Sequence, residues 1–250
     1  MVQLWCRGRC FPSVAAVIFD KDGTLADVAH YLRGVAIARA DHIAADFPDL
    51  KEPLLQAFGV RGNHLDPTGL QAVGTRQENL IAAAAFVATQ GIPWIAALER
   101  ANAAFAAADR EFTAKAELTP PLAGVMELVE QLHRAGCALA IISSDRTSAI
   151  EAFLDTYHLK PFFQLWQGGD EPPTKPDPQV FLRVCDRLGV RPDQAVVIGD
   201  ADSDGLMAQR GGAAGSIGVT WGWQRPPVLN YCDCLLASPL EMQITTDEKR

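Results

Sequence analysis

Two aspartates, Asp20 and Asp22, follow a short apolar run near the start of the chain and precede Gly23. In extended backbone, residues two apart point to the same side, so both carboxylates are expected to face one pocket. Gly23 permits the sharp turn that would follow. One carboxylate of such a pair can attack an electrophilic centre, while the second carries a proton to the leaving oxygen.

Three further groups of polar residues stand at or near the ends of apolar runs. They are Ser143 with Ser144, Lys175, and Asp200 with Asp204. Clustered carboxylates repel one another, and a bound Mg²⁺ offsets that repulsion through the oxygen ligands it prefers. A lysine ammonium would help to neutralise an arriving phosphate dianion. Each group alone is typical of a helix cap or turn, but together they predict magnesium-dependent phosphoryl transfer.

The elements that must position these residues alternate between strand and helix from residue 119 onward. Strands are expected at 14–19, 137–142, 162–166, 195–198, 215–220 and 234–237, and helices at 122–134, 147–157, 178–188 and 202–210. This alternation predicts an α/β fold with a Rossmann-like parallel sheet. Ligands bind beyond the carboxyl ends of such strands, where the strand order reverses, and the candidate residues stand at those ends.

An alanine-rich stretch separates the first strand from the rest of the sheet. Helices are expected there at 28–47, 78–90 and 94–116. Gly91 and Pro93 separate the last two, because glycine favours a helix end and proline is tolerated in a first turn. The expected domains are a discontinuous core made of 1–26 and 119–250, and an all-helical inserted domain at 27–118.

The stretch from Val17 to Leu25, VIFDKDGTL, resembles the first motif of the haloacid dehalogenase (HAD) superfamily. Ser143 resembles the second motif, Lys175 the third, and the segment from Asp200 to Asp204 the fourth. The motifs occur in family order. The resemblance therefore implies the HAD fold, with the helical insert at the family's usual position for a cap domain. The residues VTWG at 219–222 resemble phosphoglycolate-phosphatase-like members in particular.

The resemblance also implies a role for each matching residue. Asp20 would be the nucleophile, forming an aspartyl-phosphate, and a Mg²⁺ ligand. Asp22 would be the general acid and then the general base, and its main-chain carbonyl would bind the metal.

The other matching residues would bind the phosphoryl group and the metal. Ser143, with the adjacent Ser144, would hydrogen-bond phosphoryl oxygens. Lys175 would neutralise the phosphoryl group and orient the nucleophile. Asp200 would be a metal ligand, and Asp204 would support metal-bound water or Lys175.

The insert contains a segment, GTRQEN at 74–79, that resembles the family's substrate-facing cap loop. Arg76 could bind a substrate carboxylate or second phosphate through its fork of donors. The alternative is a solvated helix N-terminus. Trp221 and Trp223, which flank Gly222, are expected to serve packing rather than to stack on a substrate.

Several other activities fit parts of the pattern. A haloacid dehalogenase needs neither magnesium nor a second aspartate, so Asp22 counts against it. A phosphonate hydrolase uses a lysine of the insert, but Lys51 and Lys115 stand in no evident pocket motif. A phosphomutase of the same fold would need Asp20 and Asp22 equally and stays open.

Two alternatives come from other classes of protein. The spacing of Asp200, Asp202 and Asp204 resembles the start of an EF-hand calcium loop, but Gly211 stands where a glutamate is required. A noncatalytic interaction protein on the same scaffold would be expected to have lost at least one of four motif residues. This chain keeps all four, which are Asp20, Asp22, Lys175 and Asp200.

The composition and the net charge limit the kinds of partner that the protein is expected to bind. The chain has 250 residues, a net charge of −8 and 48% hydrophobic residues, values typical of a globular protein without a general affinity for nucleic acid or membranes. We expect a cytoplasmic monomer or homodimer acting on a small phosphorylated metabolite. Its six cysteines are expected to be reduced thiols, the alternative being a four-cysteine metal site that joins the termini.

Overall fold

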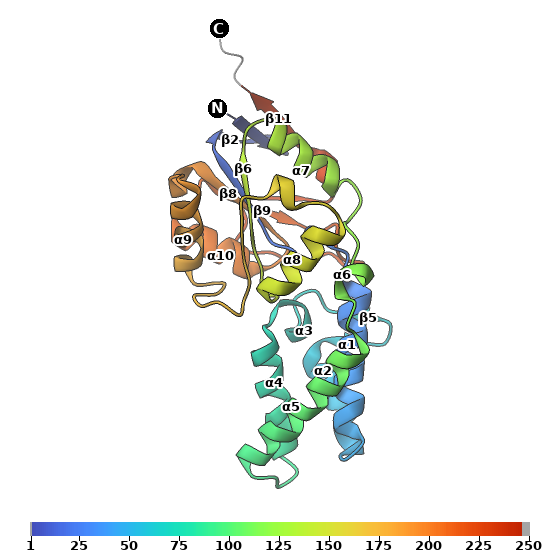
Figure 1. Ribbon diagram of the computed structural model, residues 1–250. Coiled ribbons are helices and arrows are strands. Elements are labelled where there is room, and N and C mark those ends of the chain that lie inside the picture. Colours follow the sequence, from blue (N-terminus) through green and yellow to red (C-terminus); the bar gives the residue numbers. More distant parts are fainter. Residues whose placement is uncertain (1, 247–250) are drawn as a thin grey trace. The chain divides into compact units, whose positions relative to one another are not determined.

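A computed structural model describes residues 2–246 (Figure 1). The chain divides into two compact units. One, the core, contains the residues up to 28 together with those from 119 onward, and the other, the insert, is Ala29–Leu118. Among the described helices, none combines the length and the apolar character that a membrane span requires.

A six-stranded sheet in the order β10-β9-β8-β3-β6-β7 forms the centre of the core, and every neighbouring pair is parallel. Its strands are β3 (Ala16–Phe19), β6 (Ala138–Ile142), β7 (Leu165–Gln167), β8 (Ala195–Gly199), β9 (Gly215–Val219) and β10 (Cys234–Leu236). β3, β8 and β9 are buried along their whole length, as strands of a parallel sheet covered on both faces are. The expected α/β class is confirmed.

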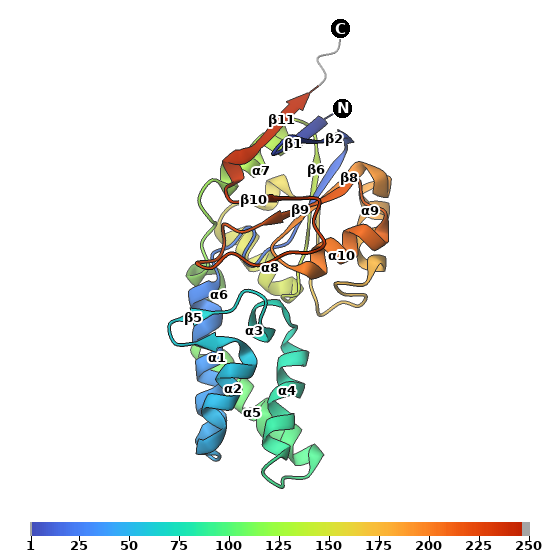
Figure 2. The same cartoon turned by 180° about the vertical axis from the view of Figure 1, so that it is seen from behind.

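Helices cover both faces of this sheet, as the two opposite views show (Figures 1 and 2). α9 and α10 bury Phe181 and Met207 in one apolar cluster with Ile18 and Val197 of the sheet. α7 and α8 lie on the opposite side. The core helices are α7 (Val125–Arg134), α8 (Thr147–Thr156), α9 (Pro178–Leu188) and α10 (Asp202–Gly211), with 3-10 turns at Lys160–Phe162, Pro192–Gln194 and Pro239–Glu241.

A small antiparallel sheet, β11-β1-β2, unites the two ends of the core (Figure 2). Its strands are β1 (Val2–Cys6), β2 (Arg9–Val14) and β11 (Met242–Thr246). Arg7 and Gly8 turn the chain between β1 and β2 with positive φ angles of 46° and 87°, the conformation that a tight two-residue hairpin requires. This sheet was not among the elements expected from the sequence.

The expectation of six reduced thiols is wrong, because Cys6 and Cys234 form a disulfide. The end of β1 lies beside the start of β10, so that their Cα atoms are 6.5 Å apart, within the range that a disulfide spans. The alternative of a four-cysteine metal site fails as well, because these two sulfurs are bonded to each other. The free cysteines are Cys10, Cys137, Cys185 and Cys232.

The insert consists mainly of helices. They are α1 (Ala29–Ala44), α2 (Lys51–Phe58), α3 (Leu70–Val73), α4 (Arg76–Ala88), α5 (Trp94–Glu111) and α6 (Lys115–Leu118), with a 3-10 turn at Pro48–Leu50. A short hairpin of β4 (Val60–Arg61) and β5 (His64–Leu65), absent from the expectation, interrupts them. The alanine-rich sequence has a structural use, because buried Ala83, Ala84 and Ala101 let α4 and α5 pack closely.

Candidate active site

Candidate residues stand at the carboxyl ends of three adjacent strands. β3 lies between β6 and β8 and pairs with each of them in parallel. Asp20 follows β3, Ser143 follows β6, and Asp200 follows β8. Because β6 and β8 lie on opposite sides of β3, the strand order reverses at this point, which is where ligands bind in sheets of this kind.

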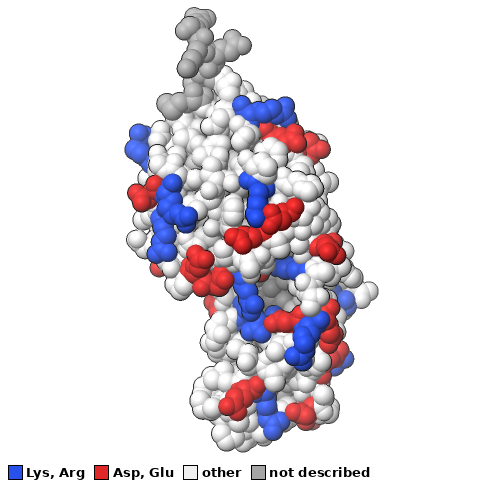
Figure 3. Space-filling view, in the orientation of Figure 1, with Lys and Arg blue, Asp and Glu red and all other residues white. Residues whose placement is uncertain are grey.

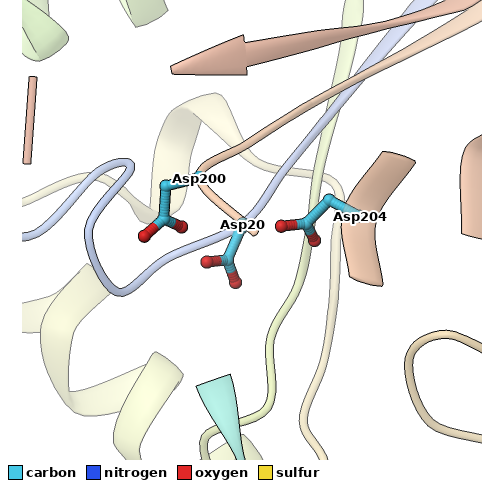
Figure 4. A group of neighbouring side chains, drawn as sticks. All are labelled: Asp20, Asp200 and Asp204. Carbon is cyan, nitrogen blue, oxygen red and sulfur yellow. The ribbon is translucent and has the colours of Figure 1, made fainter. Parts of the chain in front are cut away.

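Three aspartates form a compact cluster there. Carboxylate oxygens of Asp20, Asp200 and Asp204 lie within 4.8 Å of one another, and all three residues are buried. Figure 4 shows the carboxylates converging, with Asp20 between the other two. An all-oxygen, carboxylate-rich donor set of this size fits Mg²⁺. The side chain of Asp22 is not part of the cluster.

Lys175 is the cation of this cluster. It comes from the loop before α9, and its Nζ donates to Asp20 Oδ1 at 2.7 Å and to Asp204 Oδ1 at 2.9 Å. Only 3% of its side chain is exposed. Burial by itself would lower the pKa of Lys175, but the two carboxylates outweigh burial and raise that pKa above its ordinary value.

The cluster carries more negative than positive charge. Three carboxylates face one ammonium, so two negative charges stay unbalanced when all the groups are ionised. Burial, and then the negative charges of Asp20 and Asp204, raise the pKa of Asp200. Burial likewise raises the pKa of Asp204 to about 6, although Lys175 opposes the change. A divalent cation would balance the two charges and keep the carboxylates ionised.

The fold brings Asp204 close to β8. Asp204 lies in the first turn of α10, and its Oδ2 accepts a hydrogen bond from Ala201 N at 3.2 Å. Gly199 makes this approach possible, because a Cβ there would overlap the Asp204 carboxylate. This contact explains why the fourth motif needs a glycine before its first aspartate.

Asp22 is held by a residue that the sequence analysis did not single out. Lys21 is 1% exposed and forms ion pairs with Asp22 and, at 3.0 Å, with Asp145. Its ammonium also lies 5.6 Å from the centre of the Phe153 ring. The only signal for this role in the sequence is a lysine between the two aspartates, at a position expected to point away from their common side.

Ser143 and Ser144 extend from β6 at the same edge of the sheet. Ser143 is buried, and its Oγ accepts a hydrogen bond from Asp145 N at 3.2 Å. Ser144 is half-buried, and its carbonyl lies where a Cβ on Gly169 would be. These contacts hold the loop after β6 in place. The hydrogen bonds of the two serines to a phosphoryl group stay predictions.

Arg76 belongs to the insert and is paired within it. Its Nη2 and Nε donate to Asp109 Oδ2 at 2.8 and 3.1 Å. The residues beside it form a capping box at the start of α4, in which Thr75 accepts from Glu78 N at 3.2 Å and Glu78 accepts from Thr75 N at 2.7 Å. Much of the segment at 74–79 thus serves to begin a helix.

Arg39 is a second arginine of the insert, and sequence reasoning missed it. It is 6% exposed, donates to Gln71 Oε1 at 3.1 Å, and lies 4.2 Å above the centre of the Phe105 ring. Burial lowers its pKa to about 10, although Asp109 at 3.7 Å opposes the change. Its Nε has no hydrogen-bond partner among the described residues.

The calcium-loop alternative is wrong. An EF-hand loop follows a helix, whereas the residues before Asp200 form strand β8. Asp202 points its carboxylate elsewhere, because Oδ1 accepts from Asn230 N at 2.7 Å and Oδ2 from Asn230 Nδ2 at 3.0 Å.

Charges on the surface are arranged differently from those of the buried cluster. On the face drawn in Figure 3, basic and acidic side chains stand beside one another. Exposed pairs such as Lys160 with Asp155, 2.7 Å apart, contribute little to stability because water screens them. The concentration of carboxylates around Asp20 is therefore a feature of the interior.

Fold and sequence together define the class of protein. The family model for haloacid dehalogenase-like hydrolases matches residues 14–212, which include the whole acidic cluster. The chain belongs to this family of hydrolases.

Several similar proteins carry a more specific activity name. A phosphoglycolate phosphatase of Caulobacter vibrioides is 29% identical over 86% of this chain and 82% of its own length. A probable phosphoglycolate phosphatase of Pseudomonas putida is 33% identical over 43% of this chain and 43% of its own length. Among solved structures, a predicted phosphoglycolate phosphatase from Haemophilus somnus has a TM-score of 0.65 at 20% identity, covering 89% of this chain and 93% of that one. At this identity the structural likeness concerns the fold alone.

Proposed function

We propose that the protein is a magnesium-dependent phosphatase that hydrolyses a small phosphorylated metabolite of the phosphoglycolate type through an aspartyl-phosphate on Asp20. The observation that carries the proposal is the buried cluster in which Asp20, Asp200 and Asp204 bring oxygens within 4.8 Å of one another, with Lys175 bonded to two of them. The names of the relatives supply the substrate type.

Asp20 begins the reaction. One of its carboxylate oxygens attacks phosphorus, the bond from phosphorus to the ester oxygen breaks, and the phosphoryl group passes to Asp20. Lys175, bonded to Asp20 Oδ1, orients the carboxylate and neutralises part of the phosphoryl charge. Mg²⁺, held by the three clustered aspartates and the main-chain carbonyl of Asp22, would supply further positive charge.

Asp22 moves the proton. In its protonated form it gives the proton to the leaving ester oxygen, so that the first product departs as an alcohol. As a carboxylate it then takes a proton from the water that attacks phosphorus, which frees Asp20 and releases inorganic phosphate. Ser143 and Ser144 donate hydrogen bonds to the phosphoryl oxygens.

Asp22 and Arg76 bear on the choice of substrate. A halide leaves carbon without a proton, so the presence of Asp22 favours the phosphatase over a dehalogenase. Arg76 is the candidate for binding a second anionic group of the substrate. Because its guanidinium is paired with Asp109, that group would have to share or displace this partner.

The compartment and the oligomeric state stay predictions from the sequence: a cytoplasmic protein, monomeric or homodimeric. The bond between Cys6 and Cys234 removes the argument for the cytoplasm from free thiols, because disulfides persist mainly in oxidising compartments.

The test is the release of inorganic phosphate from phosphoglycolate, sugar phosphates and nucleoside monophosphates, with and without Mg²⁺. We expect release that requires Mg²⁺ and is abolished in Asp20→Asn. Asp193→Asn is the matched control, because Asp193 is exposed and pairs with Arg191 at 2.9 Å, so the turnover of this variant should equal that of the wild type. Phosphate retained on an isomerised sugar would favour the phosphomutase, and no turnover of any ester with Mg²⁺ present would contradict the proposal.

A further inference from the structure

The loop after β9 packs directly against the turn of the first motif. Trp221 donates its indole N–H to the carbonyl of Thr24 at 2.9 Å. A Cβ on Gly222 would overlap the carbonyl of Gly23, so the two backbones are in contact at this point. The segment at 221–223, whose two tryptophans were expected to serve packing, therefore lies against the turn that follows Asp20 and Asp22.

Trp223 reaches the cluster itself. The residue is 7% exposed, and its indole N–H donates a hydrogen bond to Asp200 Oδ2. A Cβ on Gly23 would overlap both this oxygen and the Trp223 Nε1, and Gly23 has a φ of +81°. The first motif thus needs glycine here for two reasons: its backbone conformation and the closeness of this pair.

The carboxylate of Asp200 is held from both sides. Oδ1 accepts a hydrogen bond from Thr24 Oγ1 at 3.1 Å, and Oδ2 accepts from Trp223. A carboxylate has about four lone-pair sites, so two of them stay available for a cation after both hydrogen bonds are made. The two donors come from two loops, one after β3 and one after β9. Together they leave the Asp200 side chain little rotational freedom.

We propose that Trp223 is a positioning residue, whose indole N–H fixes the Asp200 carboxylate in the orientation that binds a divalent cation. Trp221 and Gly222 hold the loop that presents this indole. The inference rests on the proposed function only in requiring that the acidic cluster binds such a cation. Partners that orient metal ligands in this way change affinity by about 10–100-fold when they are removed.

The test compares Mg²⁺ binding to the full chain and to Trp223→Phe by isothermal titration calorimetry. Phenylalanine keeps an aromatic ring in the pocket and removes the N–H donor. Trp166→Phe is the matched control, because it loses the same kind of bond, from an indole N–H to the carboxylate of Glu151 at 3.2 Å, away from the acidic cluster. We expect Trp223→Phe to bind Mg²⁺ about 10–100-fold more weakly and Trp166→Phe to bind it as the wild type does.

Activity supplies a second readout. If Trp223 acts only by orienting a metal ligand, raising the Mg²⁺ concentration should restore most of the turnover of Trp223→Phe. A loss of turnover that no Mg²⁺ concentration restores, in a folded variant with wild-type Mg²⁺ affinity, would overturn the inference.

A measurement on the wild type covers the case in which Trp223→Phe does not fold. The chain has five tryptophans, so a ¹⁵N-labelled sample gives five indole N–H signals, which the other four single variants identify by elimination. The Trp223 signal should move as Mg²⁺ is added, while the signals of the exposed Trp5 and Trp94 stay in place.

The outcomes separate the two proposals. A wild type that binds no Mg²⁺ in calorimetry would contradict the proposed function, and this inference with it. A wild type that binds Mg²⁺ with an unmoved Trp223 signal, or a folded Trp223→Phe with unchanged affinity, would overturn this inference alone.

Discussion

The core and the insert each bury a cationic side chain, and the pKa values of these two side chains are shifted in opposite directions. In the core, Lys175 bonds two carboxylates at 2.7 and 2.9 Å, and their charge raises its pKa despite its burial. In the insert, Arg39 has one carboxylate at 3.7 Å, which it shares with Arg76, and burial lowers its pKa to about 10. The number and closeness of opposite charges decide which effect wins.

The two clusters of charged residues also differ in the sign of their net charge. The core cluster has three carboxylates for one ammonium and so favours an added cation. The cluster of Arg39, Arg76 and Asp109 has two guanidinium groups for one carboxylate, so its net charge is positive.

The largest effect that sharpens this comparison is expected from Lys175→Met. Removing the ammonium leaves Asp20 and Asp204 facing each other and the incoming phosphate without their cation, so turnover should fall by about 10³-fold or more. The measurement is kcat with a phosphate ester in saturating Mg²⁺. Lys160→Met, which removes an exposed lysine, is the control and should keep full turnover. If the turnover of Lys175→Met stays within about tenfold of the wild type, the role of Lys175 as the cation of this cluster is contradicted.

Arg39→Met should have a moderate effect, on stability. It removes the hydrogen bond to Gln71 and the contact with Phe105, but it also relieves the burial of an Nε without a partner. We expect a loss of about 1–3 kcal/mol in the free energy of unfolding, measured by urea denaturation. Arg110→Met, at an exposed position of the same insert, should change it by less than about 0.5 kcal/mol. A loss as large as that from breaking a fully paired buried charge, about 3–5 kcal/mol, would show that Arg39 is as well compensated as Lys175.

The pH dependence of metal binding follows from Asp204. Its pKa in the fold is about 6, above the ordinary value of 3.8, so between these two pH values the folded chain holds more protons than the unfolded chain. The contribution of this carboxyl to the free energy of unfolding therefore falls as the pH rises through that window. A cation competes with those protons, so Mg²⁺ should raise the melting temperature more near pH 7.5 than near pH 5.

The contrary result for this prediction is an equal or larger Mg²⁺ shift near pH 5. Such a result would mean that the cation does not bind the ionised form of the cluster. Asp193→Asn should show the same pH dependence as the wild type, because Asp193 lies outside the cluster.

The smallest effect is expected at the start of α4. Thr75→Ala removes one half of the capping box and should cost about 1 kcal/mol of stability. Thr75→Ser keeps the hydroxyl and should cost much less. Thermal melts of the two variants check this, and equal losses would contradict the role of the hydroxyl in beginning the helix beside Arg76.

Residues that act beside their own strand could be predicted from the sequence. Asp20, Ser143 and Asp200 each follow a short apolar run, and parallel strands end at a common edge, so their convergence follows from local pattern and topology. Lys175 lies in a loop rather than directly after a strand, so the sequence marks it more weakly, and nothing local shows that this loop turns back to the same edge.

Contacts between distant segments could not be predicted. Trp223 touches Asp200 because the loop after β9 folds back over the first motif, and Cys6 meets Cys234 across 228 residues of chain. β2 was hidden by Pro12, which counts against a strand, but β2 is the edge of its sheet, where a proline costs no ladder hydrogen bond. α2 was missed because it is only eight residues long and contains Pro53 in its first turn, where proline is tolerated.

The most direct test of the account is a crystal structure of the protein with Mg²⁺ and beryllium fluoride, which imitates a phosphoryl group on a carboxylate. The account predicts one six-coordinate Mg²⁺ with oxygens of Asp20 and Asp200 at about 2.0–2.1 Å and the fluoride group on Asp20 beside Lys175. A cation bound by only one of these aspartates, or a fluoride group bound elsewhere, would contradict it.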